Sequence, residues 1–484
     1  MSVINARPIW LKPALLAVTL PLLAMTVSAC ATMPTGQDQA AITGLLQDRR
    51  AVTVRQSDDG LAALMAKPMT LDDAVQMAIV NSPRLALIYG QLGLDQADIL
   101  EAVEIANPHL GLSSLKAGGG KTTAQSLTLP IADLILMPAR LKLAQQARAR
   151  ARFQLASALL DVQLDVESAW YQAVAAEQTA LMRNAVASAL QTSADLAERY
   201  FNAGNITELD LSHEQAAASQ AQIAAQQAAV SAKAARANLD NLIGLSPKDQ
   251  AWSLSSALPL PTENEDRLDE LQSLALIHNL SLMAADQDLS IWDQVTATRR
   301  ATQWLGDTAL GFERERDPEG VRASGPSLDL ELPIFNQGQA KTARLNAKRD
   351  LAKAQSTQIR LNLGHQIAAR ADELQRRRQV VALHSRDLIP QRQTIVARSQ
   401  EQQNYMLLGV FGLIEAKTRE YEAYEGYIEA VRDFWLARVE LTRLVGTRLP
   451  STPDTQEVGP SAYDILEPAG SAPMMTHHDH AGQP

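Results

Sequence analysis

Residues 71–83 read LDDAVQMAIVNSP, and residues 268–280 read LDELQSLALIHNL. Both stretches place a leucine, acidic residues, an apolar run and an asparagine in nearly the same order. Later segments of the chain match in the same order: LTLPI (127–131) with LELPI (330–334), and NLIG (241–244) with RLVG (443–446). Matches at the start, middle and end of two segments indicate an internal duplication. The sequence therefore predicts two copies of one unit, over about 71–246 and 268–448.

Each copy is predicted to contain helices and strands in one order. In the first copy a helix is expected from Leu71 to about Ala106, with Thr70 as its N-cap and Asn107-Pro108 as its end. Stretches of period-two alternation predict four strands: 109–115 and 126–131 in the first copy, and 304–314 and 327–335 in the second. The segment KAGGGKTTAQ (116–125) lies between two strands and is expected to be a surface loop, not a phosphate-binding loop.

A very long helix is predicted after each pair of strands. In the first copy, apolar residues step by four and three positions, which is a heptad pattern: Leu155, Leu159, Val162, Val166, Ala169, Ala173, Ala176 and Ala180. No proline or glycine occurs from 139 to 201, so this helix is expected to be straight. Gly364 and Pro390 are expected to interrupt the corresponding helix of the second copy. Turns at 202–207 and near 408–411 then reverse the chain into a last helix.

The composition fits a helical protein and argues against other classes. Aromatic residues make up 4% of the chain, so a core of closely packed small residues is expected. The net charge is −10 and no basic stripe occurs, so nucleic acid is not an expected partner. No catalytic triad, carboxylate pair or metal-ligand cluster stands out in the two copies. Neither an enzymatic activity nor a cofactor is therefore predicted.

The first thirty residues have the pattern of a secretory signal. Arg7 and Lys12 precede an apolar run that is shorter than the roughly 20 residues a membrane-spanning helix needs. The run leads to Val27-Ser28-Ala29-Cys30, and Cys30 is the only cysteine of the chain, as in a bacterial lipobox whose cysteine is acylated. An ordinary signal peptide with an incidental cysteine is the alternative. Ala31 replaces the aspartate that would retain a lipoprotein in the inner membrane, so the outer membrane is the expected location.

These patterns divide the chain into a signal peptide (1–29), an N-terminal periplasmic segment (30–66), the first copy (67–250), a linker (251–266), the second copy (267–449) and a tail (450–484). The tail is rich in proline, serine and glycine without periodicity, so it is expected to be disordered. Near its end it contains candidate metal ligands: Met474, Met475, His477, His478 and His480. Thioethers and imidazoles suit cations such as copper or zinc. A solvated tail with chance histidines is the alternative.

The four strands of one chain are too few to close a barrel, yet strand edges must be satisfied if they lie in lipid. Oligomerisation would solve this problem. Four strands from each of three chains would make a closed 12-stranded barrel, which the long helices would continue as a tube. The predicted fold class is therefore mainly α with a small membrane β-barrel contribution, built from a duplicated helix, β-hairpin, long helix, turn and helix.

The strands of the second copy separate acids from leucines. Four acids fall on the faces opposite the apolar residues: Asp307, Glu313, Asp329 and Glu331. If the leucines faced lipid, these acids would line the lumen of the barrel, where a field of carboxylates favours cations. The alternative is that any polar side chains suffice to line a water-filled pore.

In this order, and twice, these motifs resemble the outer-membrane efflux protein family, the TolC-like channels, over about residues 70–448. The resemblance is carried by LDDAVQMAIVNSP (71–83), GNITELDLSHEQ (204–215), PIFNQG (333–338) and the two glycine-terminated helices. It implies a homotrimer with a barrel in the outer membrane and a helical tunnel across the periplasm, which meets a periplasmic adaptor (membrane fusion protein) of an inner-membrane pump. It also matches the adaptor-facing turns to Gly204, Asn205, Ile206, Leu408, Gly409 and Val410. The alternative is that the glycines only permit tight turns.

The predicted function is that of a lipid-anchored outer-membrane channel, which passively conducts substrates from pump and adaptor to the exterior. Heavy-metal cations are the substrate hypothesis, based on the strand acids and the histidine-rich tail. The same channel exporting lipophilic drugs is one alternative. A periplasmic coiled-coil adaptor or scaffold without a pore is the alternative from another class.

Overall fold

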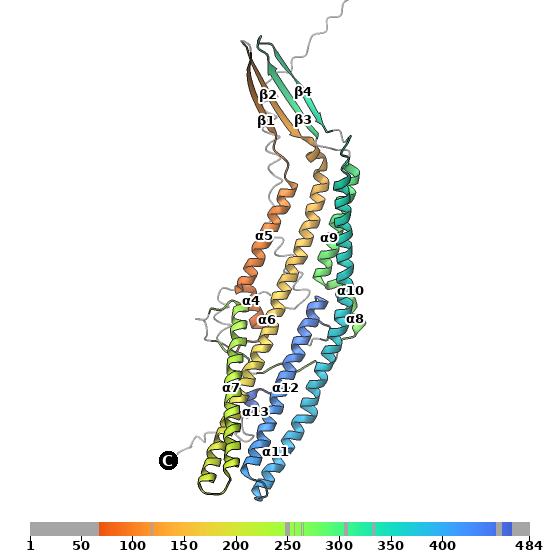
Figure 1. Cartoon of the computed structure of the whole chain (residues 1–484). Helices are drawn as coiled ribbons and strands as arrows, with labels where there is room; N and C mark the ends of the chain where they lie inside the picture. The colour runs from red at the N-terminus through yellow and green to blue at the C-terminus, as the bar shows by residue number, and fades with distance from the viewer. Residues whose placement is uncertain are drawn as a thin grey trace, which may run out of the picture. The chain divides into compact units, whose positions relative to one another are not determined.

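The computed structural model describes residues 67–117, 120–246, 252–255, 257–262, 264, 266–303, 308–331, 334–451 and 457–466, apart from the side chains of Leu92 and Ala117. All of these residues belong to one unit of the chain, Leu46–Pro484. Within this unit, long helices run side by side, and a four-stranded antiparallel sheet lies beyond one end of them (Figure 1). The described part is mainly helical with a small sheet, as the sequence predicts.

The same order of elements occurs twice along the chain (Figure 1). The first series is α4 (Leu71–Asn81), α5 (Pro83–Val103), β1 (His109–Ala117), β2 (Gly120–Pro130), α6 (Ile131–Asn202) and α7 (Glu208–Ile243). The second is α8 (Leu268–His278), α9 (Leu280–Thr302), β3 (Thr308–Arg316), β4 (Arg322–Leu330), α10 (Gln339–Leu383), the π-helix η2 (His384–Leu388), α11 (Ile389–Asn404) and α12 (Val410–Val445). A short helix, α13 (Ala462–Leu466), follows.

Thr70 caps the start of α4, as predicted. Its hydroxyl accepts a hydrogen bond from the Asp73 amide at 3.3 Å, and the Asp73 carboxylate accepts one from the Thr70 amide at 3.2 Å. This capping box satisfies amides that the first helical turn leaves free. Burial raises the pKa of the Asp73 carboxyl, but the hydrogen bonds from Thr70 and the ammonium of Lys67 outweigh burial, so the net shift is downward.

The first helix of each series is broken, whereas the sequence predicted one helix from Leu71 to about Ala106. Ser82 has an extended backbone because the ring of Pro83 disfavours the helical conformation in the preceding residue. Pro83 then begins α5, where a missing amide hydrogen is tolerated. Asn279 has the corresponding extended conformation between α8 and α9, and its side chain accepts a hydrogen bond from the Leu282 amide at 2.9 Å.

The asparagine shared by the two opening motifs joins the start of each series to its end. The side-chain amide of Asn81 donates to the carbonyl of Gly244 at 2.7 Å, and that of Asn279 donates to the carbonyl of Leu444 at 2.8 Å. Gly244 and Gly446 end α7 and α12 in the left-handed conformation, each with φ of 78°. Asn279 occupies the position of Ser82, one residue later than that of Asn81, so the two asparagines make comparable contacts from adjacent positions.

The helix α6 spans 72 residues, or roughly 110 Å at the usual rise per residue. The first six residues of the predicted heptad seam are buried, while Ala176 and Ala180 are half-buried. The helix begins at Ile131, earlier than predicted, and continues through Pro138. An ion pair between Asp133 and Arg140 links the turns on either side of this proline.

The long helix of the second series changes type only near Pro390. Gly364 lies inside α10 without interrupting it, so that expectation was wrong; a helical glycine weakens a helix by only about 1 kcal/mol, which packing can offset. The π-helix η2 comes directly before α11, in which Pro390 is the second residue. Proline lacks the amide that a regular turn needs, and a π-helical turn is one way for a helix to adapt to this.

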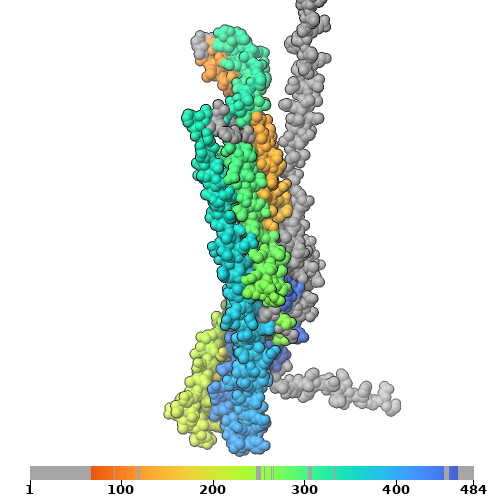
Figure 2. Space-filling model, turned by 90° about the vertical axis from the view of Figure 1, so that its right-hand side faces the viewer, coloured from red at the N-terminus to blue at the C-terminus, as the bar shows by residue number. Residues whose placement is uncertain are grey.

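The helix α6 is the centre of the helical layer. It packs against α5 and α9 near the sheet, and against α7 and α12 toward the other end (Figure 1). The helix α10 packs against α9 and α12, and Figure 2 shows α9 and α10 side by side in green and teal. The helices α5 and α7 thus form one lateral edge of the described layer, and α10 and α11 form the other.

The sheet has the strand order β1-β2-β3-β4, and every neighbouring pair is antiparallel. The first hairpin is longer than predicted, because Lys116 still pairs with Lys121 in a segment expected to be a loop. The strand β4 ends at Leu330, although strand structure was expected as far as 335. Backbone hydrogen bonds extend a hairpin through polar residues, which an apolar alternation pattern misses.

Four aromatic side chains form the centre of the core, which the low aromatic content did not predict. The rings of Tyr171 and Trp435 stack at 5.3 Å, and Trp170 and Phe434 pack edge-on against them at 5.4 Å each. The Trp170 indole donates to the carbonyl of Met69 at 3.2 Å, and the Trp435 indole donates to that of Pro259 at 2.8 Å. The expected core of small residues is therefore anchored by one aromatic cluster between α6 and α12.

Part of the tail is folded, so the expectation of disorder was wrong for residues 457–466. The Leu260 amide donates to the carbonyl of Glu457 at 2.7 Å, and the Gly459 amide donates to that of Leu258 at 2.9 Å. Ala462 in α13 is fully buried. These hydrogen bonds and the apolar contacts of α13 with α6 stabilise a segment whose composition alone favours disorder.

Candidate functional site

The register of the sheet collects apolar side chains on one side, which we call the apolar face. Residues directly opposite each other in antiparallel strands point to the same side. Leu127 lies opposite both Leu110 and Phe312, and Leu310 lies opposite both Leu129 and Leu328. Leu112 is two positions from Leu110, and Leu330 is two from Leu328, so both point to the same side. The apolar face therefore holds eight large apolar side chains. Leu110 and Leu112 are 67% and 69% exposed, so no described residue covers this face.

The opposite side of the sheet, the polar face, holds mainly small, polar and acidic residues, although Leu115 also lies on it. Gly111 lies opposite Ser126, and a methyl group added at Gly111 would meet the Ser126 hydroxyl at 2.4 Å. Two of the predicted lumen acids lie on this face, since Glu313 is opposite Ser126 and Asp329 is opposite Ala309. Glu331 follows β4 directly and is exposed, and Asp307 lies outside the described residues.

The turn between α6 and α7 is a Schellman motif. The Gly204 amide donates to the carbonyl of Phe201, and the Asn205 amide donates to that of Tyr200, both at 2.8 Å. Gly204 has φ of 74°, a conformation that favours glycine. Thr207 then caps α7. The predicted turn residues thus occupy the far end of this helix pair, away from the sheet (Figure 1).

The turn between α11 and α12 repeats this geometry with different residues. The Met406 amide donates to the carbonyl of Gln403 at 2.9 Å, and the Leu407 amide donates to that of Gln402 at 2.8 Å. Met406 has φ of 58° and therefore corresponds to Gly204, while Gly409 has an extended backbone and corresponds to the N-cap Thr207. The residues predicted for this turn, Leu408, Gly409 and Val410, did not include Met406; the equal spacing from Gly204 to Gly244 and from Met406 to Gly446 would have found it.

Replacing Met406 with glycine is expected to stabilise this turn by about 1 kcal/mol, because only glycine adopts left-handed backbone without strain. Amide hydrogen exchange over residues 405–409 should then slow several-fold, as measured by mass spectrometry. The matched control is Leu407→Gly, since Leu407 has no left-handed backbone and glycine there should only increase exchange. Equal behaviour of the two variants would contradict the strain at Met406.

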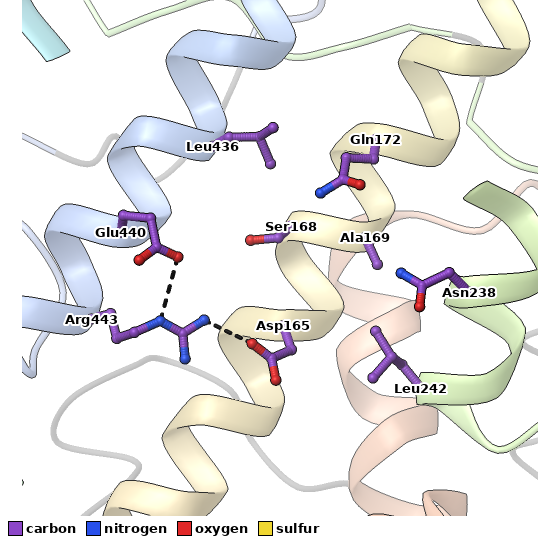
Figure 3. A pocket seen from close by; sticks show the side chains of 9 residues that line it. All are labelled: Asp165, Ser168, Ala169, Gln172, Asn238, Leu242, Leu436, Glu440 and Arg443. Atoms are coloured by element: carbon purple, nitrogen blue, oxygen red, sulfur yellow. Dashed lines mark hydrogen bonds and ion pairs between the residues drawn. The ribbon is translucent and has the colours of Figure 1, made fainter. Parts of the chain in front are cut away.

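A groove of about 460 Å³ lies between α6, α7 and α12 (Figure 3). Arg443 and Glu440 of α12 face Asp165 of α6 across it, while Asn238 and Leu242 of α7 line its other side. The groove lies at the level where α7 and α12 end. Its polar lining indicates a hydrated surface feature of the helical layer.

Arg443 connects three helices through this groove. Its guanidinium lies 2.6 Å from Asp161 and 2.8 Å from Asp165, and the other oxygen of Asp165 lies 2.6 Å from Arg84 of α5. Burial lowers the pKa of Arg443, but its hydrogen bonds to Asp165 and Asp161 outweigh burial and raise it overall. The sequence interpretation missed this ion-pair network, although Asp161 and Asp165 are spaced four apart on one helical face.

A second interhelical ion pair lies closer to the turns. Arg183 of α6 donates to Glu425 of α12 at 2.7 Å, and Glu425 is buried. Burial raises the pKa of Glu425, and the nearby Arg183 opposes the rise without cancelling it. Removing Arg183 would leave the buried carboxylate of Glu425 without its partner, so this pair contributes to the spacing of the two helices.

Several predicted site residues lie outside the described residues: Cys30, Met474, Met475, His477, His478 and His480. Their roles stay predictions. In the described ranges, no three or more His, Cys, Asp or Glu residues are grouped so that they could hold a metal ion. No helix of the described segments is long and apolar enough to cross a bilayer.

No protein-family model matches the chain. The curated cobalt-zinc-cadmium resistance protein CzcC of Cupriavidus metallidurans is 21% identical over 409 residues, which cover 81% of this chain and 95% of CzcC. The outer membrane protein VceC of Vibrio cholerae matches in structure with a TM-score of 0.63 and 16% identity, over 78% of this chain and 96% of VceC. The outer membrane channel CmeC of Campylobacter jejuni gives 0.64 and 12%, over 79% and 87%. The chain therefore has the fold of the TolC-like outer-membrane efflux channels.

Proposed function

We propose that the chain is the outer-membrane channel component of a tripartite efflux system. The observation that carries this proposal is the sheet, whose apolar and polar faces differ as the outside and inside of a membrane pore do. Its strands of 9 to 11 residues also match the length that crosses a bilayer when tilted. The fold shared with VceC and CmeC supports the same role.

Three copies would assemble into the working channel. Among the described strands, β1 pairs only with β2 and β4 only with β3, so each sheet has two open edges that other copies would satisfy. The edge helix α7 supports lateral assembly, because exposed apolar residues recur on it every seven positions: Leu209, Ala216, Ile223 and Val230. A 12-stranded barrel continued by a tunnel of helices follows from this assembly.

Heavy-metal cations are the proposed substrate. Asp307, Glu313, Asp329 and Glu331 would contribute carboxylates to the lumen of the barrel, which favours cations over anions. The name of the relative CzcC, a cobalt-zinc-cadmium resistance protein, supports this choice. The histidine- and methionine-containing tail (Met474, Met475, His477, His478, His480) would add ligands for the same ions.

The remaining parts would connect the channel to its surroundings. Acylation of Cys30 would anchor the chain to the outer membrane from the periplasm. The turns around Gly204, Asn205 and Ile206, and around Leu408, Gly409 and Val410, would meet the periplasmic adaptor of an inner-membrane pump. By geometry Met406 and Leu407 belong to the second contact, and they are 94% and 78% exposed, without cover from the described part of the chain.

The experiment that tests this function compares a strain lacking the protein with the same strain carrying the full chain. Growth is measured in cobalt, zinc, cadmium, copper and silver salts, and in a panel of lipophilic drugs. Hypersensitivity confined to metals and reversed by the full chain is the expected result. The variant Glu313→Gln/Asp329→Asn should restore growth less well, whereas Glu319→Gln, in the exposed turn between β3 and β4, should restore it fully.

Other outcomes separate the parts of the proposal. Hypersensitivity confined to drugs would overturn the cation hypothesis and leave the channel in place. Normal growth in every compound, combined with extraction of the chain as a monomer without detergent, would overturn the channel itself. That result would favour a periplasmic scaffold.

A further inference from the structure

The end of the sheet that lies farthest from the helices carries a basic cluster, formed by Lys116, Lys121, Arg314, Arg316 and Arg322. Lys116 lies opposite Lys121, and Arg316 lies opposite both Thr123 and Arg322. Lys116 is four positions from Leu112, and Arg314 and Arg316 are two and four positions from Phe312, so these three share the face of the leucines. Lys121 and Arg322 lie opposite Lys116 and Arg316 and point to the same side. All five side chains are therefore on the apolar face. The basic cluster therefore continues the apolar face toward the hairpin ends.

Charge is sorted by face throughout the four strands. The apolar face of β1 to β4 contains the five basic residues and no acid. The polar face contains Glu313, Glu315 and Asp329 and no lysine or arginine. Within β3 the residues Glu313 to Arg316 are alternately acidic and basic, so successive charges lie on opposite faces of the sheet. Solubility alone does not require acidic and basic side chains to lie on opposite faces of a hairpin.

The basic cluster is not neutralised by the described residues. None of its five side chains forms an ion pair with another described residue, and all five are exposed. Two of its pairs, Lys116 with Lys121 and Arg316 with Arg322, place like charges directly opposite each other, which destabilises a sheet. An anion bound from outside would relieve this repulsion.

The position of the cluster indicates the source of that anion. The apolar rows run from Leu330 to Leu112, about 20 Å along the strands at the usual rise, and the basic rows begin beside Leu112 and continue beyond it. Hydrocarbon would cover the apolar rows, and the basic rows would lie at the level of the lipid head groups. Phosphate groups are the anions at that level, and paired arginines bind them well.

We infer that the basic cluster binds the phosphate groups of lipid head groups around the outer end of the barrel. This inference rests on the proposed membrane location of the sheet. Bound phosphates would offset the repulsion within each hairpin and hold a layer of lipid against the channel. Adjacent copies would place further clusters around the same rim.

The test uses the full chain purified in a neutral detergent. Lipid A, which carries two phosphates, is added in mixed micelles, with phosphatidylcholine and inorganic phosphate added in separate experiments. Retained lipid is measured by mass spectrometry, and the midpoint of thermal unfolding is recorded. Lipid A should be retained and should raise the midpoint, and replacing all five basic residues with glutamine should weaken its retention at least about tenfold.

Two control variants keep the result interpretable. Lys116→Arg/Lys121→Arg preserves the charge and should retain lipid A as the unaltered chain does. Glu313→Gln/Glu315→Gln changes the opposite face of the same strand and should not reduce retention. Equal retention of lipid A by the unaltered chain and the five-glutamine variant would overturn the inference. So would a response to inorganic phosphate as strong as that to lipid A, since the site would then bind free anions.

Vesicle binding separates the lipid site from the proposed function. A chain that inserts into phosphatidylcholine vesicles but shows no preference for lipid A contradicts only the lipid site. A chain that remains in the aqueous fraction with every vesicle contradicts the membrane location itself, and the lipid site with it.

Discussion

Replacing Gly446 with alanine is expected to lower the free energy of unfolding by about 2–4 kcal/mol, because two penalties combine. Gly446 has a left-handed backbone, which costs an L-residue about 1–2 kcal/mol. The added Cβ would also lie 2.6 Å from the carbonyl oxygen of His278 and 2.9 Å from the Cα of Asn279. Both are backbone atoms, so relief requires the α8–α9 junction to move. The unfolding midpoint of the purified full chain, in denaturant or on heating, measures the effect.

Gly364 provides the matched control for this substitution. It lies inside α10 with no atom near its missing Cβ, so Gly364→Ala should stabilise the chain by about 0.5–1 kcal/mol. Gly244→Ala should behave like Gly446→Ala, since its Cβ would lie 2.2 Å from the carbonyl oxygen of Asn81. If Gly364→Ala and Gly446→Ala changed the unfolding midpoint in the same direction, the close contacts at Gly446 would not explain the effect.

Truncating Trp435 to alanine is expected to lower the free energy of unfolding by about 3–5 kcal/mol, the usual range for a large buried aromatic side chain. Trp435 is 2% exposed, and it joins Tyr171 of α6 to Phe434 of its own helix. Its indole also holds the linker through the carbonyl of Pro259. The alanine variant therefore loosens the contact between α6 and α12 and the path of the linker together. Thermal or denaturant unfolding of the full chain is the measurement.

Trp435→Phe separates these contributions. A phenyl ring keeps the stacking partner but loses the indole hydrogen bond, which leaves the Pro259 carbonyl without this donor. The expected loss is about 1–3 kcal/mol, clearly smaller than that of Trp435→Ala. If the two variants were equally unstable, the hydrogen bond to the linker, and not ring packing, would be the main contribution of this residue.

The sequence predicted the helical parts of the fold because their signals are strong and local. The heptad seam from Leu155 to Ala173 is buried as expected, and Thr70 caps α4 where its spacing from Asp73 places it. The break at Ser82 also has a local cause in Pro83, which the periodic pattern across it concealed. The spacing of apolar residues indicates which side of a helix is buried. It does not detect a single residue at which the helix breaks and begins again.

The features that the sequence did not predict depend on contacts between distant segments. The aromatic cluster brings Tyr171 and Trp435 together although they belong to different series, and no local pattern relates them. Residues 457–466 fold because the linker offers them backbone partners. The charge sorting on β1 and β2 depends on strand register, and the register was uncertain while Lys121 was assigned to a loop.

The turns at the far end of the helices show how a motif match can mislead. The residues predicted for the second turn included Gly409, as those for the first included Gly204, and they omitted Met406. The hydrogen bonds show instead that Met406 has the left-handed backbone, while Gly409 has a conformation open to any residue. Backbone conformation, and not residue identity, defines which positions correspond.

The contacts of Asn81 and Asn279 also bear on the order in which the chain folds. They join positions 163 and 165 residues apart. Closing loops of this length costs entropy that is recovered only once the intervening helices and hairpins have packed. We therefore expect the asparagines that open each series to reach their partners only after the elements between them have packed.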